Sequence, residues 1–300
     1  MGKNKFHGDM SDIIFDGLNY FILTSLLVIF LYPLVFVLSA SFSSGGALIA
    51  NKVWLFPVGF NIEGYRAVFN HRLIVTGFRN TFFYMFTGTT INLFMTVLAA
   101  YPLSRKDLDG RRVILLFFTF TMFFNAGLIP TYMLVRDMGM RNTVWSLLIP
   151  GAMSVWYVFV VRSFFESNIP DELLEASRLD GCNDFKFLSK VVLPLSKPVL
   201  AVMALLYGVG HWNSYFAALI YIDEAYLFPL QLVLRQVLIA NVIDASMMMS
   251  IDIESHAAQI NLRELLKYSL IVVSTVPFLI LYPFVQKHFV KGIMIGSVKG

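Results

Sequence analysis

A charged stretch near the centre of the chain is the part of the sequence best suited to chemistry. Residues 171–198 read DELLEASRLDGCNDFKFLSKVVLPLSKP, with acidic and basic side chains around Gly181 and long apolar segments on both sides. Side chains of both charges form charge-assisted hydrogen bonds with a partner in water. The stretch therefore predicts a polar contact surface whose flanks lie in lipid.

Patterns for catalysis, metal binding and nucleotide hydrolysis are absent from the sequence. It contains no HExxH, GxSxG or paired-carboxylate arrangement, and its single cysteine, Cys182, leaves no disulfide and no CxxC metal motif. It also lacks the GxxxxGK[ST] phosphate loop, so we do not expect the chain to hydrolyse ATP itself. We expect no cofactor and no metal, and an intramembrane enzyme using His211 is the catalytic alternative that stays open.

The composition predicts a polytopic, all-α membrane protein. The chain is 57% hydrophobic and 14% charged, whereas soluble domains carry about 25% charged residues. A membrane helix needs about 20 apolar residues, and we predict six such helices, at residues 19–42, 80–103, 113–135, 143–161, 199–222 and 266–286. Kinks are expected between Asn125 and Pro130 in the third window and at Pro150 in the fourth.

The distribution of Lys and Arg predicts the orientation of these helices. Arg105, Lys106, Arg111 and Arg112 lie within eight residues of the second connection, and such density is typical of cytoplasmic loops. We therefore expect both termini, and residues 171–198, in the cytoplasm. The predicted parts are a cytoplasmic N-terminal segment (1–18), a transmembrane domain (19–286) and a cytoplasmic tail (287–300). Within the transmembrane domain we predict a cytoplasmic element (162–198) and two external loops (43–79 and 223–265).

The predicted spans carry almost no charge. Away from the ends of the six windows, His211 is the only ionisable side chain other than tyrosine. Carriers coupled to protons or sodium keep such groups near the bilayer midplane because charge there is costly. The energy for any transport is therefore expected to come from elsewhere. The net charge of +4 reflects membrane topology, and we expect no nucleic-acid partner.

The polar stretch itself predicts two short helices joined at a glycine. Pro170 suits the first turn of a helix, and Gly181 suits the position just after its end. Asn183 or Asp184 would cap the second helix, and residues 193–198, with two prolines, would turn the chain into the fifth span. A plain connector is the alternative, but about 36 residues from Arg162 to Lys197 exceed what a connection needs. We call residues 171–198 the elbow.

A family resemblance rests on the elbow. EASRLDGC at residues 175–182 and VVLP at residues 191–194 resemble the EAA motif of ABC-importer permease subunits, whose usual form is EAAxxDGA followed by IxLP. Ser177, Cys182 and Val191 depart from that form by small or similarly shaped replacements. Weaker resemblances to carbohydrate permeases of the maltose-permease-like branch lie in YPLSR, WN, KGI and GSVKG, at residues 101–105, 212–213, 291–293 and 296–300.

The resemblance implies a function and a set of partners. It implies the type I ABC importer permease fold in a bacterial cytoplasmic membrane, and import of a sugar or oligosaccharide driven by ATP hydrolysis on a separate subunit. The implied partners are a second permease subunit, two cytoplasmic ATPase subunits and an external solute-binding protein. The residues implied in coupling to the ATPase are Glu175, Ala176, Leu179, Asp180, Gly181, Phe187, Pro194 and Lys299.

Each implied coupling role follows from the family. Glu175 and Asp180 would make polar contacts with the ATPase, and Gly181 would allow the sharp turn. Leu179 and Phe187 would fill apolar pockets of the ATPase, while the tail from residue 291 to 300 would reach between the ATPase subunits. Import of another solute, such as a peptide or polyol, by the same machinery is the alternative, and a stand-alone channel or ion-coupled carrier is a further one.

Candidates for the substrate path lie in the third and fifth windows. Trp212, Tyr215 and Leu219 are three and four residues apart and would share one helical face, where aromatic rings could stack on sugars. Asn213 and Asn125 add amides for hydrogen bonding to hydroxyl groups. Helix packing explains the aromatic residues equally well, and interhelical hydrogen bonding explains the asparagines.

Overall fold

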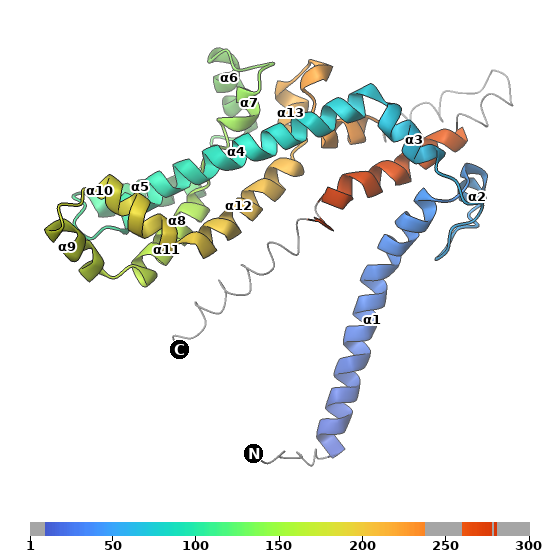
Figure 1. The fold of residues 1–300 in the computed structure, drawn as a ribbon. Coiled ribbons are helices and arrows are strands. Elements are labelled where there is room, and N and C mark those ends of the chain that lie inside the picture. The colour runs from blue at the N-terminus through green and yellow to red at the C-terminus, as the bar shows by residue number, and fades with distance from the viewer. Residues whose placement is uncertain (1–9, 238–259, 278, 281–300) are drawn as a thin grey trace. The chain divides into compact units, whose positions relative to one another are not determined.

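The computed structural model describes residues 10–237, 260–277 and 279–280, and every regular element within those ranges is a helix (Figure 1). This confirms the all-α class. The chain divides into two compact units, Met1–Asn70 with Ala240–Thr275 and His71–Ile239 with Val276–Gly300. The two units are described separately below.

The first unit begins with a long apolar helix. α1 (Met10–Ser41) spans the first predicted window, and its most apolar stretch buries none of its side chains against the rest of the chain. A helix of this length and composition, uncovered by protein, is suited to lipid. Two short helices, α2 (Gly45–Ile49) and α3 (Glu63–Asn70), and residues 260–275 of a helix that ends at residue 277 complete the unit. Its small core contains Ala40, Ala47, Leu48, Val53 and Leu265.

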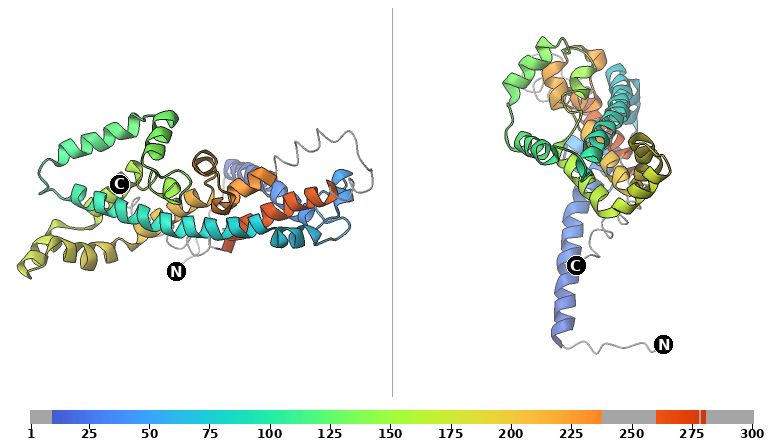
Figure 2. Two further views of the ribbon diagram at one scale, coloured as in Figure 1. Left: turned by 90° about the horizontal axis from the view of Figure 1, so that it is seen from above. Right: turned by 90° about the vertical axis from the view of Figure 1, so that its left-hand side faces the viewer.

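The second unit is organised around the other long helix, α4 (Arg72–Ser104). α12 (Lys197–Trp212) and α8 (Val155–Asn168) pack along it, as the two views in Figure 2 show. Buried Val97, Ala100 and Leu103 of α4 meet buried side chains of the other two helices, among them Val158, Val161, Phe165, Val199 and Met203. Because this core lies at the end of α4 nearest residue 104, it supports the elbow.

Two predicted windows are broken where kinks were expected. α5 (Arg111–Phe123) and α6 (Leu128–Asp137) meet at 111°. Gly127, at φ +83°, starts α6 from a conformation that glycine adopts readily. In the fourth window, α7 (Trp145–Leu148) ends two residues before Pro150, and α8 begins only at Val155.

Among the described helices, some are long and apolar enough to be the predicted membrane spans. α1 and α4 are each long and apolar enough to cross a membrane, and two bent pairs, α5 with α6 and Asp184–Leu195 with α12, qualify if each is one span. The helix at 260–277 covers the start of the sixth predicted window, and residues 281–286 lie outside the described part. The six-span count stays a prediction.

Part of the segment predicted to be the second external loop, residues 223–265, also folds against α4. η2 (Ala225–Leu227) is followed by a helix at residues 230–237. Asn80 donates from Nδ2 to the carbonyl oxygens of Tyr226 (2.7 Å) and Phe228 (3.0 Å), and the Tyr84 hydroxyl donates to that of Leu227 at 2.8 Å. These bonds attach the start of the loop to the first half of α4.

Candidate functional site

The first arm of the elbow is a short helix that ends at the predicted glycine. α9 (Asp171–Leu179) starts after Pro170, which occupies the N-cap rather than the first turn. Gly181 has φ +71°, its N–H donates to the Arg178 carbonyl at 3.0 Å, and the Cys182 N–H donates to the Ser177 carbonyl at 2.9 Å. This pair of bonds is the Schellman motif, and it requires the left-handed conformation that glycine favours.

The second arm continues into the next long helix. Asn183 caps α10 (Asp184–Phe187), since its Oδ1 accepts a bond from the Lys186 N–H at 2.9 Å. This decides between the two predicted caps. A π-helical turn, η1 (Leu188–Val192), and α11 (Leu193–Leu195), which contains Pro194, follow. The chain then turns by 81° into α12, as predicted for this proline-containing segment.

Ion pairs join both arms to the α4–α5 connection, residues 105–110. Arg105 donates from Nη1 to Asp184 Oδ1 at 2.8 Å and holds both carboxylate oxygens of Asp107, at 2.8 and 2.6 Å. Asp107 also accepts a bond from Arg178 Nη2 at 2.8 Å. The result is a continuous ion-pair chain, Arg178–Asp107–Arg105–Asp184, that runs from α9 through the connection to α10.

The ion-pair chain keeps Asp107 ionised. The hydrogen bonds and charge of Arg105, together with a bond from Arg178, hold the pKa of the Asp107 carboxyl well below its usual range. The same contact with Asp107 raises the pKa of Arg105 above its ordinary value. Each charge therefore stabilises the charged form of its partner. Both side chains stay ionised across the physiological pH range.

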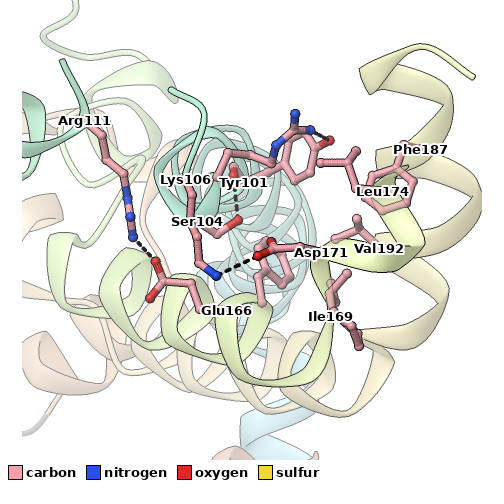
Figure 3. A pocket seen from close by; sticks show the side chains of 13 residues that line it. Tyr101, Ser104, Lys106, Arg111, Glu166, Ile169, Asp171, Leu174, Phe187 and Val192 are labelled. Atoms are coloured by element: carbon pink, nitrogen blue, oxygen red, sulfur yellow. Dashed lines mark hydrogen bonds and ion pairs between the residues drawn. The ribbon is translucent and has the colours of Figure 1, made fainter. Parts of the chain in front are cut away.

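A cavity of about 260 Å³ lies between the connection, the end of α8 and the elbow (Figure 3). Figure 3 shows two ion pairs across it, Lys106 with Asp171 at 2.6 Å and Arg111 with Glu166. Apolar side chains line the rest, including Phe165, Ile169, Leu174, Phe187 and Val192. Its lining combines charged groups at the rim with an apolar floor.

The outer face of the elbow is exposed and unpaired. The Glu175 and Asp180 side chains make no hydrogen bond or ion pair with any residue that the structure describes. Leu179 is 91% exposed and Phe185 is 78% exposed. Ala176 and Pro194 are exposed as well. Two large apolar side chains next to unpaired carboxylates form a surface suited to a protein partner.

Phe187 corrects the prediction for this surface. It is only 2% exposed and packs into the core of the second unit, so it cannot fill a pocket of another protein. Phe185 has the exposed position instead, and sequence reasoning missed it. The signal was present, because residues two apart on a helix point in nearly opposite directions, so only one of these two rings can be buried. Lys299 lies outside the described residues.

The predicted substrate-path residues do not share one surface. α12 ends at Trp212 and α13 (Phe216–Tyr221) starts four residues later, so the single helical face through Trp212, Tyr215 and Leu219 is wrong. Trp212 is 2% exposed and lies edge-on to Phe82, 5.2 Å between ring centroids, which matches the helix-packing interpretation. Asn213 donates to the Val209 carbonyl at 3.0 Å as the C-cap of α12.

The two remaining path candidates serve local structure or lie exposed. Asn125 accepts a bond from the Gly127 N–H at 2.9 Å within the break between α5 and α6. Tyr215 is exposed, and the Arg235 guanidinium lies 6.0 Å from its ring centroid. Neither contact tests whether a substrate passes these side chains.

A cavity with several polar groups in its lining, which the sequence did not predict, lies among the helices of the second unit. It measures about 460 Å³, and α4, α7, α8, α12 and α13 contribute its lining. Asn92 Oδ1 lies 2.6 Å from His211 Nε2, and Asn92 Nδ2 donates to the Gly151 carbonyl at 2.6 Å. Hydroxyl and aromatic groups surround this bond, from Ser146, Tyr157, Tyr207, Ser214 and Tyr221.

Long apolar helices, an open cavity lined in part by polar groups and an exposed polar elbow are together typical of a membrane permease. The model of the family described as binding-protein-dependent transport system inner membrane component matches residues 92–295, more than half of the chain. The chain belongs to this family of ABC-importer permeases.

Relatives of known name agree with this assignment. The polygalacturonan/rhamnogalacturonan transport system permease protein YtcP of Bacillus subtilis is 36% identical over 97% of this chain and 100% of its own length. Protein LplC of the same species is also 36% identical, over 98% of both chains. A chain in the crystal structure of a bacterial ABC transporter involved in the import of alginate, an acidic polysaccharide, superposes with a TM-score of 0.86 at 35% identity, over 94% of this chain and 99% of that one.

Proposed function

We propose that this chain is a six-span permease subunit of an ATP-driven importer in the bacterial cytoplasmic membrane, with both termini in the cytoplasm. One observation carries the proposal: the elbow exposes Leu179 and Phe185 beside two carboxylates, Glu175 and Asp180, that have no partner among the described residues. Large apolar side chains at the surface of a monomer mark sites of protein contact. The density of Lys and Arg in the α4–α5 connection supports a cytoplasmic position for that surface.

The partner at the elbow is a cytoplasmic ATPase. Since the sequence has no phosphate loop, the energy enters through contact with a separate subunit. Glu175 and Asp180 pair with cationic groups of that subunit, while Leu179 and Phe185 fill apolar pockets. When the ATPases close on ATP, the elbow moves with them, and the helices change between two packed arrangements. A second permease and two ATPase subunits complete the assembly.

The substrate is an oligosaccharide delivered by an external binding protein. The cavity around Asn92 and His211 offers amide, hydroxyl and aromatic groups, which bind sugars by hydrogen bonds and stacking. Acidic oligosaccharides are the first class to test, because the polygalacturonan permease and the alginate transporter are both named for acidic polysaccharides. The described residues lining the cavity of this chain carry no carboxylate that would repel such a substrate.

Uptake by the assembled complex tests the proposal. The complex, reconstituted in proteoliposomes with its binding protein, is expected to accumulate labelled oligogalacturonide only when ATP is present on the ATPase side. Glu175→Lys is expected to abolish copurification of the ATPase and uptake together. Asp16→Lys, the same charge reversal at an exposed carboxylate of α1 outside both the elbow and the α4–α5 connection, serves as the matched control. Uptake at the wild-type rate by Glu175→Lys would contradict the docking role.

A further inference from the structure

Apolar packing does not fix the first arm of the elbow. α9 contains no buried residue, and only Leu174 and Ser177 along it are half-buried. The second arm differs, because Phe187, Leu188 and Val192 are buried in the core of the second unit. A helix held by so little buried surface needs other contacts to keep its position. Those contacts come from the α4–α5 connection.

The ion-pair chain supplies the strongest of these contacts. Its central residue, Arg105, has a side chain only 13% exposed, and its guanidinium grips Asp107 through two parallel hydrogen bonds. Ion pairs contribute little when both partners are free in water, and more when the geometry is bidentate and several charges form a network. Asp184 of α10 pairs with the shielded Arg105, and Arg178 of α9 pairs with Asp107, whose side chain is 47% exposed, at 2.8 Å each.

The same connection is anchored to the end of α4. Arg105 directly follows the helix, and its Nη1 donates to the Tyr101 hydroxyl at 3.0 Å. The Leu103 carbonyl accepts bonds from Arg111 Nε at 2.8 Å and from Arg162 Nε at 3.0 Å. Cations at the C-terminus of a helix also stabilise its dipole. A continuous series of polar contacts therefore runs from α9 to α4.

We infer that the ion-pair chain Arg178–Asp107–Arg105–Asp184 makes the α4–α5 connection a positioning device that transmits the movement of the elbow to α4. The inference rests on the proposed function, because it assumes that an ATPase moves the elbow. Arg105 and Asp107 act through the arms that they hold, and we assign neither of them a contact with the ATPase. α4 then moves with both arms as one body, and the cavity that Asn92 of α4 lines opens or closes with it.

Breaking the ion-pair chain is expected to separate docking from transport. In Asp107→Asn the carboxylate that both arginines share becomes neutral, while its size is kept. The outer face of the elbow is unchanged, so the ATPase still binds. The Lys106–Asp171 pair still joins the connection to α9, but both of its side chains are largely exposed, so it contributes little. α9 then shifts more readily without α4, so ATP is hydrolysed with little transport. Arg105→Gln removes the other central charge and is expected to have the same effect.

The experiment compares three quantities for the purified complex in proteoliposomes. These are the amount of ATPase that copurifies with this chain, the rate of ATP hydrolysis, and the number of substrate molecules transported per ATP. For Asp107→Asn we expect the first two within twofold of wild type and transport per ATP reduced at least fivefold. Arg136→Gln, which removes an exposed ion pair in α6, is the control and is expected to change none of them.

The ratio of transport to hydrolysis separates this inference from a general loss of folding. A smaller amount of folded complex lowers both rates in proportion and leaves their ratio unchanged. An unchanged ratio in Asp107→Asn and Arg105→Gln would therefore overturn the inference. Failure of the wild-type complex to transport any oligosaccharide with ATP would instead refute the proposed function. The two failures are distinguishable within one set of measurements.

Chemical cross-linking supplies a second test. Cysteines replace Asp107 and Arg178 in a Cys182→Ser background, and a short thiol-to-thiol cross-linker then restores the link between the connection and α9. We expect transport per ATP to be low before cross-linking and to recover at least threefold after it. No recovery at complete cross-linking, with the ATPase still bound, would show that a link at this position does not transmit the movement.

Discussion

Gly181→Ala is the change whose cost the structure defines most closely. Gly181 has φ +71°, and a Cβ atom placed there meets no other atom within 4 Å. The cost is therefore conformational rather than steric, about 1–2 kcal/mol for an L-residue in the left-handed region. Because each 1.4 kcal/mol is tenfold in an equilibrium constant, the equilibrium constant for forming the docking-competent turn falls by about five- to thirtyfold.

The chain offers a matched control for this change. Gly139 has φ +69° and the same open surroundings, and it ends α6 with the same Schellman pair of bonds, to the carbonyls of Arg136 and Val135. Gly139→Ala thus introduces the same strain outside the elbow. Copurification of the ATPase and ATP-driven uptake are measured for both variants.

We expect Gly181→Ala to lower both quantities and Gly139→Ala to leave them near wild type. Gly181→Asn should give copurification and uptake between those of wild type and Gly181→Ala, since Asn tolerates the left-handed region better than Ala. Equal effects of Gly181→Ala and Gly139→Ala would refute the reasoning that ties this turn to docking.

Three further predictions concern packing, exposure and pH. Gly88→Ala places a Cβ against the His211 side chain of α12 and should destabilise the complex by about 1–3 kcal/mol. Gly208→Ala has room for its Cβ and should be neutral or stabilising by about 0.5–1 kcal/mol. A lower melting temperature for Gly208→Ala than for Gly88→Ala would contradict this. Phe187→Ala should lower the stability of the protein by about 3–5 kcal/mol, measured by thermal unfolding. Leu179→Ala should change that stability by less than about 0.5 kcal/mol yet weaken ATPase binding, measured by copurification. The Asp107 carboxyl has a lowered pKa in the folded protein. Its contribution to stability is therefore complete above its unfolded pKa of about 4 and is lost only as the pH falls below that value. The melting-temperature difference between wild type and Asp107→Asn should be constant from about pH 5 to 8 and shrink only in stronger acid.

Local conformation was predictable where a residue type has one strong backbone preference. Gly181 and Asn183 mark the turn and the second cap because glycine favours positive φ and asparagine caps helices. The break before Leu128 and the turn at residues 193–198 follow from glycine and proline in the same way. These signals act over a few residues, so they survive without knowledge of the tertiary structure.

Contacts between distant segments were not predictable from the sequence. The partners of Arg105 lie 2 and 79 residues away, and Asn92 is bonded to His211 119 residues away. Polar side chains inside a membrane protein are expected to find partners, but the sequence does not say which. The burial of Trp212 likewise depends on Phe82 of α4. Trp212 was a candidate substrate contact only because an aromatic ring can stack on a sugar, and the sequence did not show that the ring is buried against α4.

Photo-cross-linking from position 179 tests the central claim most directly. A photoreactive amino acid replaces Leu179 in the assembled complex. After activation by light, the cross-linked adduct is identified by mass spectrometry. We predict an adduct with the cytoplasmic ATPase subunit, and none with that subunit when the same group replaces Trp156, an exposed aromatic residue of α8. Adducts of position 179 with lipid or with the external binding protein, and none with the ATPase, would contradict the role assigned to the elbow.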